Sequence, residues 1–179
     1  MGKILNSLND SLKGFIKNQH LFFVATAARD GRVNVSPKGM DTLRVIDNNR
    51  VAWLNLTGSG NETAAHLLDI NRMTLLFCSF EKMPMILRLY GQANTIHAAD
   101  EGFDKLASLF PPFSGARQIF DMTIESVQTS CGYAVPFFQF EGQRNKLSEW
   151  AQDKGKEGIQ QYWQERNKVS IDGFETGMK

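Results

Sequence analysis

Two short segments of this 179-residue chain carry residues that suit the binding of an anion. The first reads Asn34-Val35-Ser36-Pro37-Lys38-Gly39 and places a lysine at a strand end, beside a glycine that lets the backbone approach a ligand closely. The second, residues 57–63, is a Gly/Ser loop before a predicted helix, whose first backbone amides favour negative charge. One predicted β-hairpin separates the segments, so the fold could bring Lys38 and the residues from Ser59 to Thr63 to one phosphate.

The loop Gly58-Ser59-Gly60-Asn61-Glu62-Thr63 matches neither common nucleotide-binding motif. It lacks the third glycine of the dinucleotide fingerprint, and no Gly-Lys-Ser/Thr follows as in a P-loop. Ser59 and Glu62 have the spacing of a capping box, in which both side chains serve only to start the helix. A carboxylate at Glu62 also competes with an anion for the same amides. Helix capping and anion binding therefore both stay open.

Arg88 is a charged residue inside the apolar segment Met85-Ile86-Leu87-Arg88-Leu89-Tyr90. Strand alternation places it on the face that Ile86 and Tyr90 share. A guanidinium in such surroundings needs an anionic partner. That partner is either an internal carboxylate, such as Glu62, or a ligand phosphate.

Side chains able to perform acid–base, covalent or metal chemistry form no useful pattern. The histidines His20, His66 and His97 have no metal-ligand spacing with each other or with the two cysteines, so we expect no metal site. No serine stands in a nucleophile-elbow motif. We therefore expect any catalysis to depend on a bound cofactor, and the sequence identifies no catalytic residue.

Composition favours one soluble domain spanning residues 1–179. Twenty Lys and Arg stand against 19 Asp and Glu, and a net charge of +1 argues against a nucleic-acid partner. The apolar runs are too short to cross a bilayer, and the N-terminus has no export signal. We expect a cytoplasmic protein that makes no membrane contact and keeps its cysteines reduced.

Hydrophobic periodicity predicts the elements that position these residues. Helices are expected over residues 4–18, 61–70, 98–109 and 146–167, the last broken near Gly155 or Gly158. Strands are expected over 21–28, 33–36, 43–46, 51–56, 73–80, 85–96 and 120–128, with a bend at Gly91. Successive hairpins with inserted helices favour a mainly β fold, an antiparallel β-barrel with peripheral helices.

Together these motifs resemble the pyridoxamine 5′-phosphate oxidase-like family, and more narrowly its oxidase-related, FMN-binding split-barrel proteins. The resemblance extends over about residues 15–150 and rests on Val33–Gly39, the strand that bears Trp53, Gly58–Leu67 and Ile86–Gly91. It implies a six-stranded antiparallel split barrel that forms a homodimer, with FMN in clefts between the subunits.

The resemblance also implies which residues bind FMN. Lys38 matches the lysine that reaches the flavin phosphate, and Asn34 to Pro37 match the strand along the isoalloxazine ring. Asn61 to Thr63 stand where the oxidases carry Ser-Arg-Lys, and Arg88 matches the arginine of their Gln-Val-Arg strand. The expected cofactor-binding set is Asn34, Val35, Ser36, Pro37, Lys38, Trp53, Ser59, Asn61, Glu62, Thr63 and Arg88.

The implied function is that of an FMN-dependent oxidoreductase whose small-molecule substrate or electron donor is unassigned. Ile86 replaces the glutamine of the oxidase strand, and the oxidases' C-terminal Trp and Arg signature is not evident, which argues against pyridoxamine 5′-phosphate oxidation itself. Two alternatives stay open. One is a non-catalytic protein that binds or senses a flavin or haem, and the other is a deazaflavin-dependent reductase.

Overall fold

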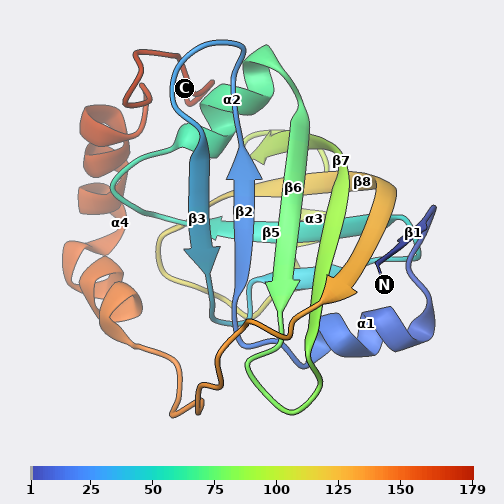
Figure 1. The fold of residues 1–179 in the computed structure, drawn as a ribbon. Helices are drawn as coiled ribbons and strands as arrows, with labels where there is room; N and C mark the ends of the chain where they lie inside the picture. Colours follow the sequence, from blue (N-terminus) through green and yellow to red (C-terminus); the bar gives the residue numbers. More distant parts are fainter. Residues whose placement is uncertain (1) are drawn as a thin grey trace.

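Two long antiparallel strands, β7 (Met85–His97) and β8 (Ala116–Cys131), form the spine of the fold. In the computed structural model, which describes residues 2–179, they lie in a sheet of order β3-β2-β6-β7-β8-β5-β4, and β1 pairs with β8 (Figure 1). The other strands are β1 (Lys3–Leu5), β2 (Phe22–Thr26), β3 (Asn34–Lys38), β4 (Leu43–Val45), β5 (Arg50–Leu56) and β6 (Arg72–Cys78). Every pairing is antiparallel.

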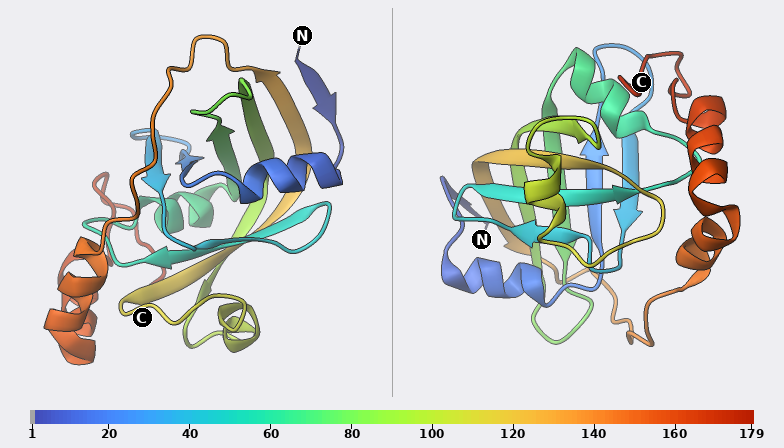
Figure 2. Two further views of the ribbon diagram at one scale, coloured as in Figure 1. Left: turned by 90° about the horizontal axis from the view of Figure 1, so that it is seen from below. Right: turned by 180° about the vertical axis from the view of Figure 1, so that it is seen from behind.

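The sheet curls because β7 and β8 bend at Gly91. The register of this pair shifts between Tyr90 and Gly91, and a Cβ atom at Gly91 would lie 1.9 Å from the carbonyl oxygen of Thr123, so only glycine fits. Beyond the bend, the start of β8 pairs with β5 and its end pairs with β1. The result is a curled half-barrel (Figure 2), which confirms both the predicted bend and the predicted mainly β split barrel with peripheral helices. Its sheet has eight strands, of which β1 and β4 span three residues each.

Apolar side chains fill the concave side of the sheet. Leu12, Phe15 and Ile16 of helix α1 (Asp10–Lys17) close one end of this core. Its buried sheet residues include Val24, Trp53, Leu75, Phe77, Leu87, Leu89, Phe120 and Met122. Helix α3 (Phe103–Ala107) covers a second cluster, formed by Ala52, Leu54, Leu106, Phe110 and Ile119. The core therefore holds β5 and β8 rigidly beneath the site described below.

The prediction of one N-terminal helix over residues 4–18 is wrong in its first half. Residues 3–5 form β1, because they pair with Val127–Thr129 of β8. The helix begins only at Asp10, where the side chain of Asn9 accepts a hydrogen bond from the backbone N–H of Leu12 (2.9 Å). In residues 3–5, pairing with a strand distant in sequence therefore outweighs the local helical pattern.

Two further helices flank the sheet. Helix α2 (Glu62–Asp69) follows β5, and helix α4 (Lys146–Arg166) lies beside β3 (Figure 1). Gly155 interrupts α4 with a φ of 65°, which confirms the predicted break at the first of the two candidate glycines. Within residues 2–179, no helix has the length and apolarity that a membrane span needs.

Candidate anion-binding site

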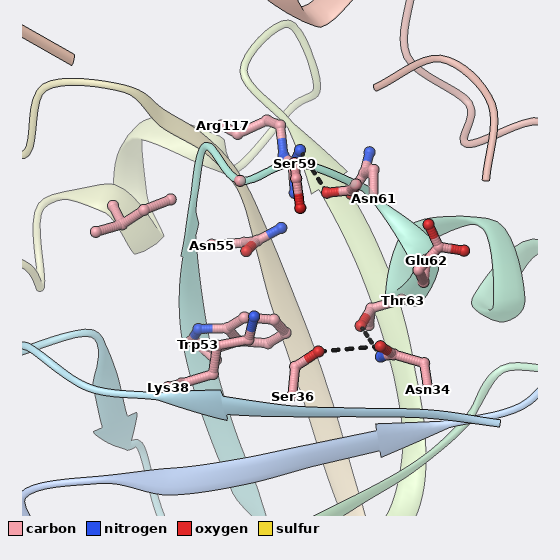
Figure 3. Close-up of a pocket in the computed structure, with 13 residues that line it drawn as sticks. Asn34, Ser36, Lys38, Trp53, Asn55, Ser59, Asn61, Glu62, Thr63 and Arg117 are labelled. Carbon is pink, nitrogen blue, oxygen red and sulfur yellow. Dashed lines mark hydrogen bonds between the residues drawn. The ribbon is translucent and has the colours of Figure 1, made fainter. Parts of the chain in front are cut away.

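A cavity of about 250 Å³ lies between β3, the end of β5, the loop before α2 and the start of β8 (Figure 3). Its walls come from segments that the sheet and α2 bring together from distant parts of the chain. The lining residues are Asn34, Ser36, Lys38, Trp53, Asn55, Leu56, Gly58, Ser59, Gly60, Asn61, Glu62, Thr63 and Arg117.

Strand β3 supplies one wall through alternate residues. Asn34, Ser36 and Lys38 line the cavity. Val35 and Pro37 point to the opposite side of the strand, and Val35 is 61% exposed. Since β3 is an edge strand of the sheet, the side of it that points away from β2 pairs with no other strand of the described chain.

Lys38 brings a positive charge into this cavity. Its ammonium nitrogen lies 5.2 Å from the centroid of the Trp53 ring, and that ring stacks on Phe120. Burial, and then repulsion from Arg117, lower the pKa of Lys38 from 10.5 to about 8. The ammonium group is thus partly desolvated beside a second cation.

Arg117 is the second cation, and only 3% of its surface is exposed. Its Nη1 donates to the carbonyl of Gly60 (3.1 Å) and to Oδ1 of Asn167 (2.5 Å). The side-chain oxygen of Asn55, in the amide orientation that satisfies its neighbours, accepts from Nη2 (2.8 Å). Within residues 2–179 no protein acceptor reaches Nε. Burial lowers the pKa of Arg117 to about 10.

Neither cation has an acidic partner within the described chain, where all the salt bridges involve other residues. Glu62 does line the cavity, but both of its carboxylate oxygens accept from the backbone N–H of Ile171 (3.2 and 3.1 Å). A buried guanidinium and a half-buried ammonium group, neither with a compensating carboxylate in the described chain, favour an anion as the ligand.

The loop between β5 and α2 is held by the C-terminal part of the chain. Asn167, which is fully buried, donates to the carbonyl of Gly58 (3.1 Å) and accepts from the side chain of Asn61 at its own carbonyl (3.4 Å). Gln118 of β8 donates to the side chain of Asn61 (2.6 Å). The loop backbone is therefore fixed before any ligand arrives.

The capping box, one of the two alternatives for this loop, does not form. Asn61, not Ser59, is the N-cap residue of α2, and no side-chain hydrogen bond caps the helix. The carboxylate of Glu62 binds Ile171 in the C-terminal segment, so it does not reach back to the loop amides. This contact spans 109 positions, and local spacing gave no indication of it.

Arg88 lies outside the cavity. It occupies the outer face of the sheet with Ile86 and Tyr90, as alternation predicted, while Leu87 and Leu89 are buried. Its Nη1 donates to Oγ of Ser130 (3.1 Å), and within residues 2–179 it forms no salt bridge. Of the two alternatives for Arg88, the internal carboxylate partner is therefore not found within residues 2–179.

Eight of the eleven predicted site residues line the cavity, and Val35, Pro37 and Arg88 do not. Sequence reasoning missed Arg117 and Asn55, which line it. Arg117 was missed because the strand was expected to begin at residue 120, whereas β8 begins at Ala116 and holds this arginine among buried residues. No group of three or more potential metal ligands occurs in the described part of the chain.

Comparison with known proteins gives consistent results. Residues 8–131 match the family profile described as pyridoxamine 5′-phosphate oxidase. A protein of Aspergillus flavus, named pyridoxamine 5′-phosphate oxidase family protein ustO, is 34% identical over 189 residues, which cover 94% of this chain and 75% of the relative.

Solved structures share the fold at lower identity. A protein of Lactobacillus delbrueckii, described as a candidate pyridoxamine 5′-phosphate oxidase, has a TM-score of 0.55 and 22% identity, covering 69% of this chain and 94% of its own. The HupZ protein of group A Streptococcus has a TM-score of 0.53 and 21% identity, covering 67% and 91% of the two chains. At these identities the likeness concerns the fold alone.

Proposed function

Because this chain belongs to the pyridoxamine 5′-phosphate oxidase family, we propose that it is a flavoprotein that binds FMN, with the phosphate held between Lys38 and Arg117. The observation that carries this proposal is the pair of cations, Arg117 buried and Lys38 half-buried, that have no carboxylate partner within residues 2–179. Burial makes both charges costly in the free protein, and a phosphate dianion would compensate both.

The residues present fit such a group. Nε of Arg117 is buried and lacks a protein acceptor in the described chain, so a phosphate oxygen is a suitable partner. The cavity of about 250 Å³ is smaller than the roughly 300–1,000 Å³ typical of ligand pockets. It therefore suits the phosphate end of FMN, and the rest of the cofactor must lie beyond it.

When bound, FMN supplies hydride-transfer chemistry. The proposed activity is therefore that of an oxidoreductase, and its substrate is not identified. The chain's own residues bind the phosphate, and Trp53 with β3 bounds the adjoining space. The alternative is a non-catalytic flavin-binding protein. One observation supports it: the carboxylate lining the cavity, that of Glu62, is engaged by Ile171 and is a poor candidate for proton transfer.

We further infer that the protein is a homodimer. The outer face of β3, β2, β6 and β7 carries Val35, Phe23, Leu76, Ile86 and Tyr90 at partly or largely exposed positions. Figure 1 looks onto this face, and no helix crosses it. A second copy packed there would also reach the rim of the cavity, because β3 bounds both. Sedimentation of the purified protein tests this, and a monomer at micromolar concentration would refute it.

Absorption spectra test the cofactor assignment. The purified protein is incubated with excess FMN, desalted and measured for retained flavin. About one FMN per chain is expected, and riboflavin, which lacks the phosphate, should be lost on desalting. Loss of both flavins, or equal retention of both, would refute phosphate anchoring by Lys38 and Arg117. Steady-state turnover of a reductant by the loaded protein then separates the oxidoreductase from the non-catalytic alternative.

A further inference from the structure

A chain of hydrogen bonds leads from the cavity to a buried histidine. Ser36 donates to Oδ1 of Asn34 (2.9 Å), and Nδ2 of Asn34 donates to the hydroxyl oxygens of Thr63 (3.3 Å) and Thr26 (3.5 Å). The Thr26 hydroxyl lies 3.0 Å from Nδ1 of His66. Figure 3 shows the part of this chain that faces the cavity. His66 itself is 1% exposed and does not line the cavity.

The direction of each hydrogen bond follows from the donors available. An amide nitrogen only donates, so with the Asn34 amide in this orientation the Thr26 oxygen accepts from Nδ2. Within residues 2–179 the acceptor then left in reach of the Thr26 hydrogen is Nδ1 of His66, to which the hydroxyl donates. Nδ1 is therefore an acceptor, and the neutral imidazole carries its hydrogen on Nε2. Within residues 2–179, Nε2 is buried without a partner.

The same reasoning fixes what the cavity offers to a ligand. The Ser36 hydroxyl donates its hydrogen to Asn34, so towards a ligand the Ser36 oxygen can only accept a hydrogen bond. Thr63 accepts from Asn34 and keeps its own hydrogen for donation. The wall therefore presents an acceptor at Ser36 and a donor at Thr63.

The orientation of the Asn34 amide decides this pattern. Rotating the amide by half a turn would place its oxygen against Thr26 and Thr63 and its nitrogen against Ser36. In that arrangement the Thr26 hydrogen would turn to the amide oxygen, and Nδ1 of His66 would carry a hydrogen and donate it to Thr26. The tautomer of His66 and the orientation of the Asn34 amide are therefore coupled, although His66 does not line the cavity.

We propose that His66 is a positioning residue that fixes the Asn34 amide, and that the cavity thereby selects a ligand group with a hydrogen-bond donor for Ser36 and an acceptor for Thr63. Amides, imides and polyols meet this requirement. An unpaired buried nitrogen costs stability, so His66 is not explained by its packing alone. The part of the proposal that concerns the ligand rests on the proposed FMN function, whereas the hydrogen-bond direction does not.

The hydrogen-bond direction is tested on the ligand-free protein. ¹⁵N NMR of protein labelled at histidine distinguishes the two imidazole tautomers, and His66→Asn identifies the resonance. A neutral ring with its hydrogen on Nε2 is expected. A hydrogen on Nδ1, or a charged ring at pH 7, would overturn the proposal. This result stands whether or not FMN binds.

A double-mutant cycle tests the action through Asn34. His66→Leu should weaken FMN binding roughly 2- to 10-fold in the native background, the effect of one misdirected hydrogen bond. It should have no effect in an Asn34→Ala background, because the amide that it orients is gone. Equal weakening in both backgrounds, or none in either, would overturn the proposal. His66→Asn, which can place an acceptor near the position of Nδ1, should restore most of the affinity that His66→Leu loses. If the native protein does not bind FMN, the proposed function fails and the NMR result alone decides the role of His66.

Discussion

The affinity of the cavity for FMN should fall as the pH rises through about 8, because Lys38 loses its proton there. Burial first and repulsion from Arg117 second lower the pKa of Lys38 from 10.5 to about 8 in the ligand-free protein. A bound phosphate favours the charged ammonium and raises this pKa again. Binding above pH 8 therefore requires the uptake of a proton.

The size of the effect follows from the titration of this one group. Near pH 7 most Lys38 side chains carry a proton, so the affinity changes little below that point. At pH 9 only about one in ten is protonated in the free protein, so the dissociation constant should be roughly tenfold larger than at pH 7. The phosphate does not contribute, because its second pKa of about 6 lies below this range.

Quenching of FMN fluorescence at pH 7, 8 and 9 measures the dissociation constant. Lys38→Arg keeps a charge that does not titrate in this range, so the affinity of that variant should be nearly independent of pH. Lys82→Met changes an exposed lysine outside the cavity and should keep the native pH dependence. A native dissociation constant that is unchanged between pH 7 and pH 9, or the same pH dependence in Lys38→Arg, would refute the assignment of Lys38 to the phosphate.

The lowered pKa of Lys38 affects the stability of the ligand-free fold in the opposite direction: stability rises with pH, whereas FMN affinity falls. The pKa of Lys38 is lower in the folded chain than in the unfolded chain, so the unfolded chain binds more protons between about pH 8 and pH 10.5. The contribution of Lys38 to stability therefore rises with pH across this window. Thermal unfolding should show this rise in the native protein and not in Lys38→Met.

Three further substitutions test other parts of the structure. Arg117→Met should weaken FMN binding by about 1.5–3 kcal/mol, the value of a charge-assisted hydrogen bond, and unchanged affinity would exclude Arg117 from the site. Removal of the uncompensated buried charge should offset part of the stability lost with the hydrogen bonds to Gly60, Asn55 and Asn167, which thermal unfolding measures. Arg88→Glu on the uncovered sheet face should shift sedimentation towards the monomer through repulsion between copies, and an unchanged dimer would place the interface elsewhere. Gly91→Ala should destabilise the fold by roughly 4 kcal/mol or more, because its Cβ meets the backbone oxygen of Thr123 at 1.9 Å; a urea midpoint equal to that of the native protein would contradict the close contact.

Alternation and local turn chemistry made much of the fold and part of the site predictable. The pattern from Asn34 to Lys38 gives a strand in which every second residue faces inward, and the structure places Asn34, Ser36 and Lys38 in the cavity. Gly91 predicted a bend in the strand and Gly155 predicted a break in the helix, because the backbone at each of these positions needs a residue without a side chain.

Contacts between distant segments account for what the sequence did not reveal. Arg117 lines the cavity because the curl of the sheet brings the start of β8 beside the loop at Gly60, and no local pattern encodes that approach. The capping box is absent for a similar reason, because the carboxylate of Glu62 accepts from the distant backbone N–H of Ile171 and not from the loop before α2. Alternation gave the correct face for Arg88, but it could not say which side of the sheet is the outside.

The hydrogen bonds of Asn167 set an order of events during synthesis of the chain. Its side chain donates to the carbonyl of Gly58, which the ribosome makes 109 residues earlier. The sheet strands and α2 can therefore emerge and pair while the loop beside them still lacks its brace. Arg117 likewise gains its Asn167 acceptor only at that late stage. Under the proposed function, a nascent chain becomes competent to hold the phosphate only after α4 has left the ribosome, and cofactor loading would belong to the last steps of the protein's maturation.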